Sequence, residues 1–402
     1  PEGLPTVMTI TTALGLEKMA RKKTIVRKLS AVESLGSITI LATDKTGTLT
    51  TNKMSVQRLF VDDQEFDTRH DNFSIKSESF DKICTNGIVC STTSLVYQSS
   101  KSFDFVGDST EAAILLLAQK KGYNSEEIKK EWQIIDEKAF DQKLKRMHVI
   151  AERQGKKTVF AKGTPESILG LCSRIESKGK VLVLDEVRKR KILEIARQMA
   201  KDGLRLVAFS YKNHGPENSE SDHIFLGMVG IADPLRIEVK DAVAKAHSAG
   251  IKVVMITGDN ELTASKIAIE AGIMQKGDDV LTGSQLDTYT DDALLNIMPK
   301  VSVFARTTPE HKLRLVTLMQ KMGEIVAVTG DGVNDALALK QAHIGIAMGI
   351  TGTDVAKETA DVVITDDNFA TFIDAVEEGR TIFTQIKNAI LYLLTTNAAE
   401  IF

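Results

Sequence analysis

Seven consecutive residues near the start of the chain constrain its fold and chemistry more than any other segment. Their sequence is Asp44-Lys45-Thr46-Gly47-Thr48-Leu49-Thr50, and it follows an apolar run at residues 38–42. Such a run is typical of a buried parallel strand. A carboxylate just past the strand, with a glycine-containing turn after it, stands where α/β sheets bind phosphates. A lone Asp would be read as an ordinary loop residue, but the complete string predicts a phosphate-handling site.

Length and composition set only broad limits. The 402 residues are enough for two or three domains. The 51 basic and 54 acidic residues give a formal charge of -3, which argues against nucleic-acid binding. Cys84, Cys90 and Cys172 show neither metal-ligand nor paired spacing, which fits a reducing cytoplasm. No stretch reaches the roughly 18 apolar residues of a spanning helix, and no signal peptide opens the chain.

The two ends of the chain point away from an ordinary soluble protein. Residues 1–10 lead into a basic cluster, as at the cytoplasmic end of a membrane helix: Lys18, Arg21, Lys22, Lys23, Arg27 and Lys28. Residues 388–402 hold a single charge, Glu400, in an apolar and small-residue run. We therefore interpret the chain as a fragment of a membrane protein, cut within a membrane helix at each end.

The second half of the chain alternates strands and helices. Helices are expected at residues 238–249, after Asp259 and at 309–322, ending at Gly250, Gly272 and Gly323. Strands are expected at residues 251–256, 325–328, 344–347 and 362–364. Repeated βα units favour a parallel sheet with right-handed crossovers, so we expect a Rossmann-like α/β core. The 180 or so residues between the first strand and this region differ in character and predict a domain inserted after that strand.

Carboxylates follow two of the expected strands at the same sheet edge. Phosphoryl transfer needs a nucleophile, charge neutralisation and a divalent cation. Asp44 can be the nucleophile that forms an acyl phosphate. Asp44 and Asp331 would supply carboxylates to Mg²⁺, with the Thr46 carbonyl as a further ligand and Asp335 in support. Asp331 or Asp335 alone is equally well explained as a helix cap.

Three further groups would act on the phosphoryl oxygens. Thr257 and the amides near Gly258 and Gly47 would hold those oxygens. Lys312, in Pro309-Glu310-His311-Lys312, would neutralise charge on the transferring group. Taken singly, Thr257-Gly258-Asp259 is a common turn and Lys312 an ordinary solvated helix lysine. Their occurrence in one order with the Asp44 and Asp331 segments carries the prediction.

That ordered set of motifs resembles the P-type ATPases, with the calcium-pump branch as the nearest likeness, over the whole chain. The resemblance implies a haloacid-dehalogenase-type core with a large inserted α+β nucleotide-binding domain. The implied organisation is a membrane helix end and stalk at 1–25, a phosphorylation domain at 26–55 and 231–372, the nucleotide-binding domain at 56–230, and a second stalk and membrane helix start at 373–402. Most of this fragment would face the cytoplasm, within a parent that crosses the lipid membrane several times.

The resemblance also assigns residues to ATP. Glu111, in Gly107-Asp108-Ser109-Thr110-Glu111, would contact the adenine, although Asp108 to Thr110 can equally cap a helix. Phe140 would stack on the adenine, whereas a lone Phe beside charges is more often a core residue. The resemblance further implies that Lys145 contacts phosphate or ribose, that Lys162 lines the adenine pocket and that Arg205 reaches toward the phosphates. Lys162 begins a Lys-Gly-Thr-Pro-Glu segment in which the family has Ala in place of Thr164. The remaining implied nucleotide contacts are Thr46, Thr257, Gly258, Asp259, Arg306, Lys312 and Asn334.

The resemblance places ion ligands at the two ends and a hinge between the domains. Glu2 lies between prolines, which free helix carbonyls to bind a cation. Asn397 and Glu400 share one helix face. All three match the calcium pumps, so Ca²⁺ is the expected transported cation, while Na⁺, Mn²⁺ or Na⁺/K⁺ exchange stay open. Residues 233–236, Asp-Pro-Leu-Arg, resemble the family's hinge, with Leu235 in place of a proline.

Two other functions remain as alternatives. Phosphatases of the same superfamily carry a second Asp two positions after the nucleophile, and here that position is Thr46. The acyl phosphate should therefore persist, which favours a transport intermediate over a soluble aspartate-nucleophile phosphatase. A non-enzymatic nucleotide-binding regulator is the second alternative. No Thr-Gly-Glu actuator motif is present, so we expect this chain to bind ATP and not to pump.

Overall fold

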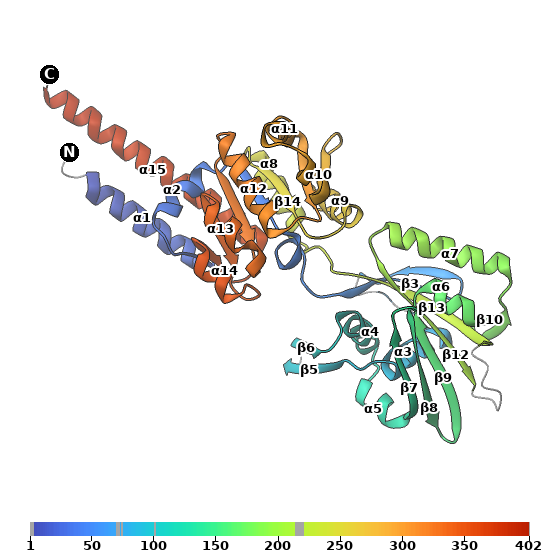
Figure 1. Ribbon diagram of the computed structural model, residues 1–402. Helices are drawn as coiled ribbons and strands as arrows, with labels where there is room; N and C mark the ends of the chain where they lie inside the picture. The colour runs from blue at the N-terminus through green and yellow to red at the C-terminus, as the bar shows by residue number, and fades with distance from the viewer. Residues whose placement is uncertain (1–3, 70–72, 74, 100–101, 214–220, 402) are drawn as a thin grey trace. The chain divides into compact units, whose positions relative to one another are not determined.

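The computed structural model describes residues 4–69, 73, 75–99, 102–213 and 221–401 (Figure 1). It divides into two compact units. Unit 1 combines the chain up to Asn52 with the chain from Leu235 onward, and unit 2 is the continuous segment Lys53–Pro234. The second boundary falls inside the segment that resembles a hinge.

Unit 1 is built on an eight-stranded sheet with the order β1-β19-β18-β17-β2-β14-β16-β15. The central strand β2 (Ile40–Thr43) pairs in parallel with β17 (Val326–Gly330) and β14 (Lys252–Ile256). Further parallel strands are β18 (Ile344–Met348), β19 (Val362–Ile364), β16 (Val301–Ala305) and β15 (Asp279–Thr282). The strand β1 (Thr24–Val26) is antiparallel to β19 at one edge. The pattern at residues 325–328, 344–347 and 362–364 correctly predicts strands, but it misses β1, β15 and β16.

Both faces of this sheet are covered, as is usual for parallel sheets. Leu41 of β2 joins one apolar cluster with residues of α2 (Ser30–Ser37), α8 (Val239–Ser248), α9 (Glu261–Glu270) and α15 (Phe369–Ile401). Its neighbours Ile40 and Ala42 join a second cluster with α11 (Asp291–Ile297), α12 (Pro309–Lys321) and α13 (Ala336–Gln341). Shorter helices are α10 (Gly283–Thr288) and α14 (Asp354–Thr359).

Glycines end three of these helices as predicted. Gly250, Gly272 and Gly323 follow α8, α9 and α12 with φ of 76°, 76° and 85°. This left-handed conformation is one that glycine adopts at little cost at the end of a helix. The local sequence therefore fixes where each chain segment turns back toward the sheet.

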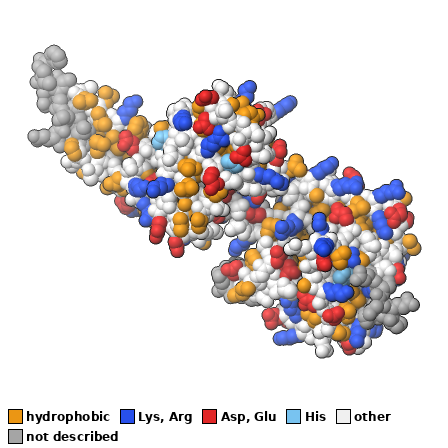
Figure 2. All heavy atoms as spheres, in the orientation of Figure 1, with side chains coloured by type: hydrophobic (Ala, Val, Ile, Leu, Met, Phe, Trp, Pro, Cys, Tyr) orange, Lys and Arg blue, Asp and Glu red, His pale blue; other side chains and the backbone are white. Residues whose placement is uncertain are grey.

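Helices α1 (Leu4–Arg21) and α15 run side by side (Figure 1). Lys18 of α1 and Lys22, just after its end, lie 3.4 and 3.5 Å from the Glu378 carboxylate of α15. Apolar side chains are exposed toward the N-terminal end of α1 and the C-terminal end of α15 (Figure 2): Met8, Ile10, Leu14, Leu391, Tyr392 and Leu394. Among the described residues, no helix has both the length and the apolar character needed to cross a membrane.

Unit 2 has a nine-stranded, largely antiparallel sheet. Its strands are β3 (Ser55–Val61), β4 (Gln64–Asp67), β7 (Gln133–Asp141), β8 (Arg146–Arg153), β9 (Lys156–Gly163), β10 (Cys172–Ser177), β11 (Lys180–Val183), β12 (Arg205–Asn213) and β13 (His223–Ala232). A separate hairpin joins β5 (Ser94–Ser99) and β6 (Ser102–Val106). The helices are α3 (Glu78–Val89), α4 (Ser109–Lys120), α5 (Ser125–Glu131), α6 (Pro165–Leu171) and α7 (Glu186–Lys201). The whole molecule is thus a mixed α/β protein with several sheets.

Candidate active site

A cavity of about 300 Å³ opens at the carboxyl ends of β2, β14 and β17. Parallel strands bring their carboxyl ends to one edge, so loops distant in sequence meet there. The cavity is lined by Asp44, Thr46, Thr257, Gly258, Asp259, Thr307, Pro309, Lys312, Asp331, Gly332, Asn334 and Asp335. The cavity lining therefore brings together the unit 1 residues that the sequence assigns to phosphate, Mg²⁺ and ATP, except Gly47 and Arg306.

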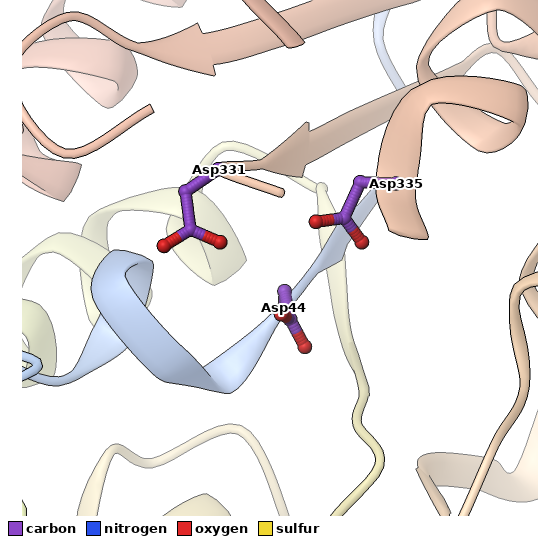
Figure 3. Close-up of side chains that lie close together, drawn as sticks. All are labelled: Asp44, Asp331 and Asp335. Atoms are coloured by element: carbon purple, nitrogen blue, oxygen red, sulfur yellow. The ribbon is translucent and has the colours of Figure 1, made fainter. Parts of the chain in front are cut away.

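Three carboxylates gather in this cavity (Figure 3). Asp44, Asp331 and Asp335 each offer an oxygen, and these atoms lie within 4.8 Å of one another. Asp44 follows β2, whereas Asp331 and Asp335 belong to the turn after β17. Hard carboxylate oxygens suit Mg²⁺, which takes one or two carboxylates together with phosphate oxygens and waters. The donor set therefore fits a magnesium ion.

Lys312 neutralises part of this charge. Its Nζ lies 2.6 Å from Asp335 Oδ1 and 3.3 Å from Asp44 Oδ1. Only 8% of the residue is exposed, so the alternative of a solvated helix lysine is wrong. Asp335 also accepts a hydrogen bond from Gly332 N–H at 3.1 Å and makes no side-chain cap to α13, so it closes the turn instead.

Crowding of the carboxylates changes their protonation. Burial raises the pKa of Asp44 to about 6; Asp335 adds to the rise and Lys312 opposes it. Burial also raises the pKa of Asp331 to about 6, with the charges of Asp44 and Asp335 acting in the same direction. Burial would lower the pKa of Lys312, but the two neighbouring carboxylates outweigh it and raise that pKa. Such perturbed groups in a cleft are typical of functional sites.

The turn after Asp44 is shaped for close approach. Gly47 has φ of 71°, and a Cβ built there would overlap Asp331 Oδ2. Arg236, from the segment that resembles a hinge, holds the turn from outside, since its Nη2 donates to the Gly47 carbonyl at 3.0 Å and its Nε to the Thr50 carbonyl at 3.1 Å. The glycine is thus required on two counts, by its backbone conformation and by the carboxylate beside it.

Sequence reasoning gave no role to several residues of the site. Lys45 is 8% exposed, and its Nζ lies 2.6 Å from Asp259 Oδ2. Thr307 donates from both its N–H and its Oγ1 to the Thr257 carbonyl, each at 3.0 Å. The sequence offered one signal for each residue, since Lys45 is next to Asp44 and Thr307 stands two positions before Pro309.

Arg306, which the sequence does assign to ATP, is exposed and does not line the cavity. Its N–H donates to the Asp259 carbonyl at 2.8 Å.

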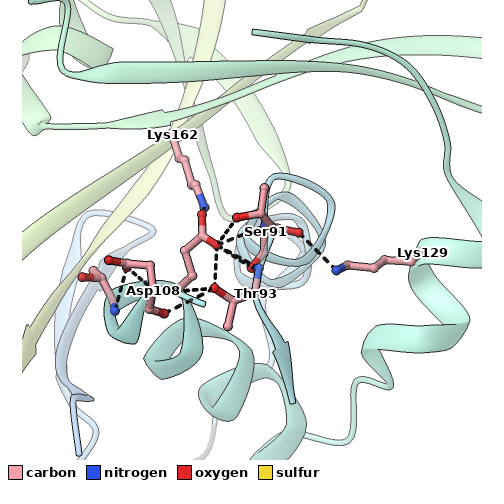
Figure 4. A network of polar contacts seen from close by, with 8 residues as sticks. Ser91, Thr93, Asp108, Lys129 and Lys162 are labelled. Carbon is pink, nitrogen blue, oxygen red and sulfur yellow. Dashed lines mark hydrogen bonds and ion pairs between the residues drawn. The ribbon is translucent and has the colours of Figure 1, made fainter. Parts of the chain in front are cut away.

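In unit 2, Glu111 contacts Ser91, Thr93 and Lys162 of a polar network (Figure 4). Its Oε1 lies 2.6 Å from Lys162 Nζ. Its Oε2 accepts hydrogen bonds from Ser91 Oγ and from the N–H and Oγ1 groups of Thr92 and Thr93, at 2.8 to 3.2 Å. Burial raises the pKa of Glu111, but Lys162 and these donors outweigh it and hold the pKa at about 2. Glu111 is therefore an ionised, fully hydrogen-bonded carboxylate.

Phe140, Lys145 and Arg205, also assigned to the nucleotide, lie in unit 2 as well. Phe140 on β7 is 57% exposed, so the alternative of a core phenylalanine is wrong. Lys145 is exposed in the turn between β7 and β8. Arg205 donates from Nη1 to Thr110 Oγ1 at 2.7 Å. Asp108 caps α4, with Oδ1 accepting from the N–H groups of Thr110 and Glu111 at 2.8 and 3.1 Å, as the capping alternative proposed.

The predicted ion ligands are not tested by this geometry. Glu2 lies outside the described residues. Asn397 and Glu400 belong to α15, in a part of the helix whose side chains are not described.

Known proteins resemble this chain in one segment and along its whole length. Residues 79–238 match the family P-type ATPase, cytoplasmic domain N. Along its entire length the chain is 42% identical to Calcium-transporting ATPase 1 of Bacillus cereus, 40% identical to Calcium-transporting ATPase 1 of Saccharomyces cerevisiae, and 39% identical to Cation-transporting ATPase pma1 of Synechocystis. It covers 45%, 44% and 47% of these proteins, so it spans about half the length of the relatives it matches. Residues 79–238 therefore match a P-type ATPase domain, and the chain as a whole is similar to about half of each of several proteins named as calcium-transporting ATPases.

Proposed function

We propose that this chain is the catalytic portion of an ATP-driven cation pump, most closely of the calcium-transporting kind, and that it transfers the γ-phosphate of ATP to Asp44. The observation that carries the proposal is the single cavity in which Asp44, Asp331 and Lys312 meet. An aspartate beside a buried lysine and a second carboxylate suits a phosphoryl acceptor that works with a divalent cation.

In the proposed step a carboxylate oxygen of Asp44 bonds to the γ-phosphorus while the bond from that phosphorus to the bridging oxygen of ADP breaks. ADP leaves with the electron pair, and the product is an aspartyl phosphate. Lys312 offsets the negative charge that gathers around Asp44, and Thr257 with the Gly258 and Gly47 amides holds the phosphoryl oxygens. Magnesium, held by Asp44, Asp331 and the Thr46 carbonyl, with Asp335 in support, would neutralise phosphate charge when bound.

Thr46 supports a lasting intermediate. It lines the cavity two positions after Asp44, where a phosphatase of this superfamily has a second Asp. No carboxylate stands there to activate water against the acyl phosphate. The aspartyl phosphate would therefore persist and be available to drive a conformational change.

Unit 1 corresponds in this proposal to a haloacid-dehalogenase-type phosphorylation domain at 26–55 and 231–372, and unit 2 to an inserted nucleotide-binding domain at 56–230. Exposure of Phe140 supports its role as the ring on which adenine stacks. Glu111 and Lys162 would line the adenine pocket, Lys145 would contact phosphate or ribose, and Arg205 would reach toward the phosphates. In unit 1, Asp259, Arg306 and Asn334 would complete the nucleotide contacts.

The two ends would connect this catalytic portion to a lipid membrane. Exposed apolar side chains on paired helices α1 and α15 support this part of the proposal. Glu2, Asn397 and Glu400 would bind the transported cation, with Ca²⁺ favoured by the names of the relatives in Bacillus cereus and Saccharomyces cerevisiae. Transport by the full-length parent with Ca²⁺, Mn²⁺ and Na⁺ offered in turn tests the ion.

Phosphorylation is tested by incubating the purified chain with γ-labelled ATP and Mg²⁺. We expect an acid-stable, hydroxylamine-sensitive label that is absent in Asp44→Asn. The control is Asp241→Asn, which changes an exposed aspartate on α8 and should label like the wild type. Rapid turnover of small phosphate esters would instead support a soluble phosphatase. Normal ATP binding without any phosphoenzyme would support a nucleotide-binding regulator.

A further inference from the structure

The side chain of His311 has both ring nitrogens engaged at the start of α12. Its Nδ1 accepts a hydrogen bond from Thr308 N–H at 3.2 Å, and its Nε2 lies 2.8 Å from Asp287 Oδ1 on α10. The Thr308 hydroxyl accepts in turn from His311 N–H at 3.3 Å, which completes a reciprocal capping box. The ring is nearly buried, with 11% of its side chain exposed. The two partners of the ring, Thr308 and Asp287, are not among the residues that line the cavity.

This geometry selects one form of the histidine. Thr308 N–H can only donate, so Nδ1 must carry a free lone pair. The Asp287 carboxylate accepts, so the proton belongs on Nε2. Gly283 of α10 packs against the ring, since a Cβ built there would lie 3.1 Å from both Cε1 and Nδ1. The ring has little room to turn over and exchange its two partners.

The turn that His311 closes carries residues of the cavity lining. Its members Thr307, Pro309 and Lys312 line the active-site cavity. The first backbone hydrogen bond of α12 runs from Lys312 N–H to the Thr308 carbonyl at 3.1 Å. Any shift of Thr308 therefore moves the backbone of Lys312, whose Nζ lies between Asp44 and Asp335.

We propose that His311 is a positioning residue for phosphoryl transfer: as the neutral Nε2–H tautomer it fixes the first turn of α12 and so holds Lys312 against Asp44 and Asp335. The inference rests on the proposed transfer to Asp44 and adds a residue that acts through Lys312. Protonation of the ring would set an N–H against the Thr308 N–H and break the cap, although the resulting cation would still pair with Asp287. Other charged groups on the packed elements are Glu310 and Arg314 of α12, Arg306 before it, and Asp291 of α11, which lies 2.8 Å from Arg314.

The tautomer is tested without ATP on the purified chain labelled with ¹⁵N-histidine. The ring signal that disappears in His311→Gln belongs to His311. At pH 7.5 we expect shifts of a neutral ring protonated on Nε2, and a change in the Nε2 shift in Asp287→Asn. A ring protonated on Nδ1, or one averaging between tautomers, overturns the proposal whether or not Asp44 is phosphorylated.

Positioning is tested by single-turnover phosphorylation from labelled ATP. Gln at the same place can accept from Thr308 N–H and donate to Asp287 without titrating, so His311→Gln should rescue what His311→Leu loses. We expect His311→Leu to slow transfer about tenfold or more with unchanged nucleotide affinity, because small displacements of catalytic groups cost up to about 100-fold. Equal rates for His311→Leu and wild type contradict the inference and leave the proposed function standing. No phosphoenzyme in the wild type defeats the proposed function itself.

A matched control variant, His343→Leu, removes a similar hydrogen bond from a backbone N–H to a histidine ring. His343 Nδ1 accepts from Val326 N–H at 3.0 Å, at the opposite end of β17 from the cavity. His343→Leu should lower the thermal stability and leave the single-turnover rate unchanged. A loss of rate in His343→Leu as large as in His311→Leu would show that the effect is one of general stability.

Discussion

At the scale of single residues, the main feature of the candidate active site is the negative charge gathered in one small cavity. Asp44, Asp331 and Asp335 share it with one buried cation, Lys312. Two of the three carboxylates respond with a pKa near 6. The cavity is thus poised to gain from any added positive charge, which is what a divalent cation supplies.

This arrangement predicts the sign of a pH effect on stability. A carboxyl whose pKa is raised on folding binds more protons in the folded state, so its contribution is fully present below about pH 4. It is lost as the pH rises through the folded value of about 6. In EDTA, the free energy of unfolding of unit 1 should therefore fall between pH 5 and 7.5, by on the order of 2 kcal/mol.

The variant Asp331→Asn should weaken that pH dependence, because it removes one of the crowded charges. At pH 7.5 in EDTA we expect it to be more stable than the wild type by about 1 to 2 kcal/mol in urea denaturation. Added Mg²⁺ should stabilise the wild type more than the variant. A variant that is less stable than the wild type at pH 7.5 and no different at pH 5 would contradict the crowding argument. Asp241→Asn serves as the exposed control.

At the scale of elements, the turn at residues 45–49 is what lets two strand ends share one cavity. It packs against the end of β17 because Gly47 has no side chain to meet Asp331. Three other glycines with positive φ, Gly250, Gly272 and Gly323, face open space. The chain therefore contains glycines that share a backbone conformation and differ in their surroundings.

Gly47→Ala should combine two costs. The left-handed backbone costs about 1 to 2 kcal/mol with a Cβ present, and the Cβ would also displace the Asp331 carboxylate. We expect lower stability and a loss of phosphoenzyme of about 100-fold. Gly323→Ala, with φ of 85° and nothing within 4 Å, should show only the backbone cost in denaturation and normal phosphorylation. Normal phosphorylation of Gly47→Ala would refute the close approach.

At the scale of the whole molecule, each buried apolar cluster draws its residues from one unit. Two clusters belong to unit 1 and three to unit 2. Unit 2 is a continuous segment, whereas unit 1 needs both of its segments to form the sheet around β2. An uninterrupted chain with its own core is expected to fold alone.

Residues 53–234 expressed alone should therefore unfold cooperatively and bind ATP without becoming phosphorylated. Calorimetry of the whole chain should show two transitions, one of them matching the isolated segment. Lys162→Ala in that segment should weaken ATP binding, and it should cost about 3 kcal/mol of stability because it leaves Glu111 without its buried partner. Failure of the segment to fold would contradict the independence of its core.

The sequence alone determined the features that depend on local chemistry. Short-range preferences account for the alternation of strands and helices and for the glycines that end α8, α9 and α12. The order of the segments that contain Asp44, Thr257, Lys312 and Asp331 can also be read directly from the sequence. These features predicted a parallel α/β sheet and the residues at its carboxyl edge. The pattern missed the short strands β1, β15 and β16, although it found β14, β17 and β19, which are not longer.

Only the tertiary structure decided which partners these residues meet. Several contacts join residues that are far apart in the chain. They are the burial of Lys312 and its closer contact with Asp335, the Lys45–Asp259 ion pair, and the hydrogen bonds from residues 91–93 to Glu111. His311 is the sharpest case, since its neighbour Asp287 belongs to another helix. Local preferences set the backbone of each segment, whereas distances between charges depend on strand order and on the packing of both sheet faces.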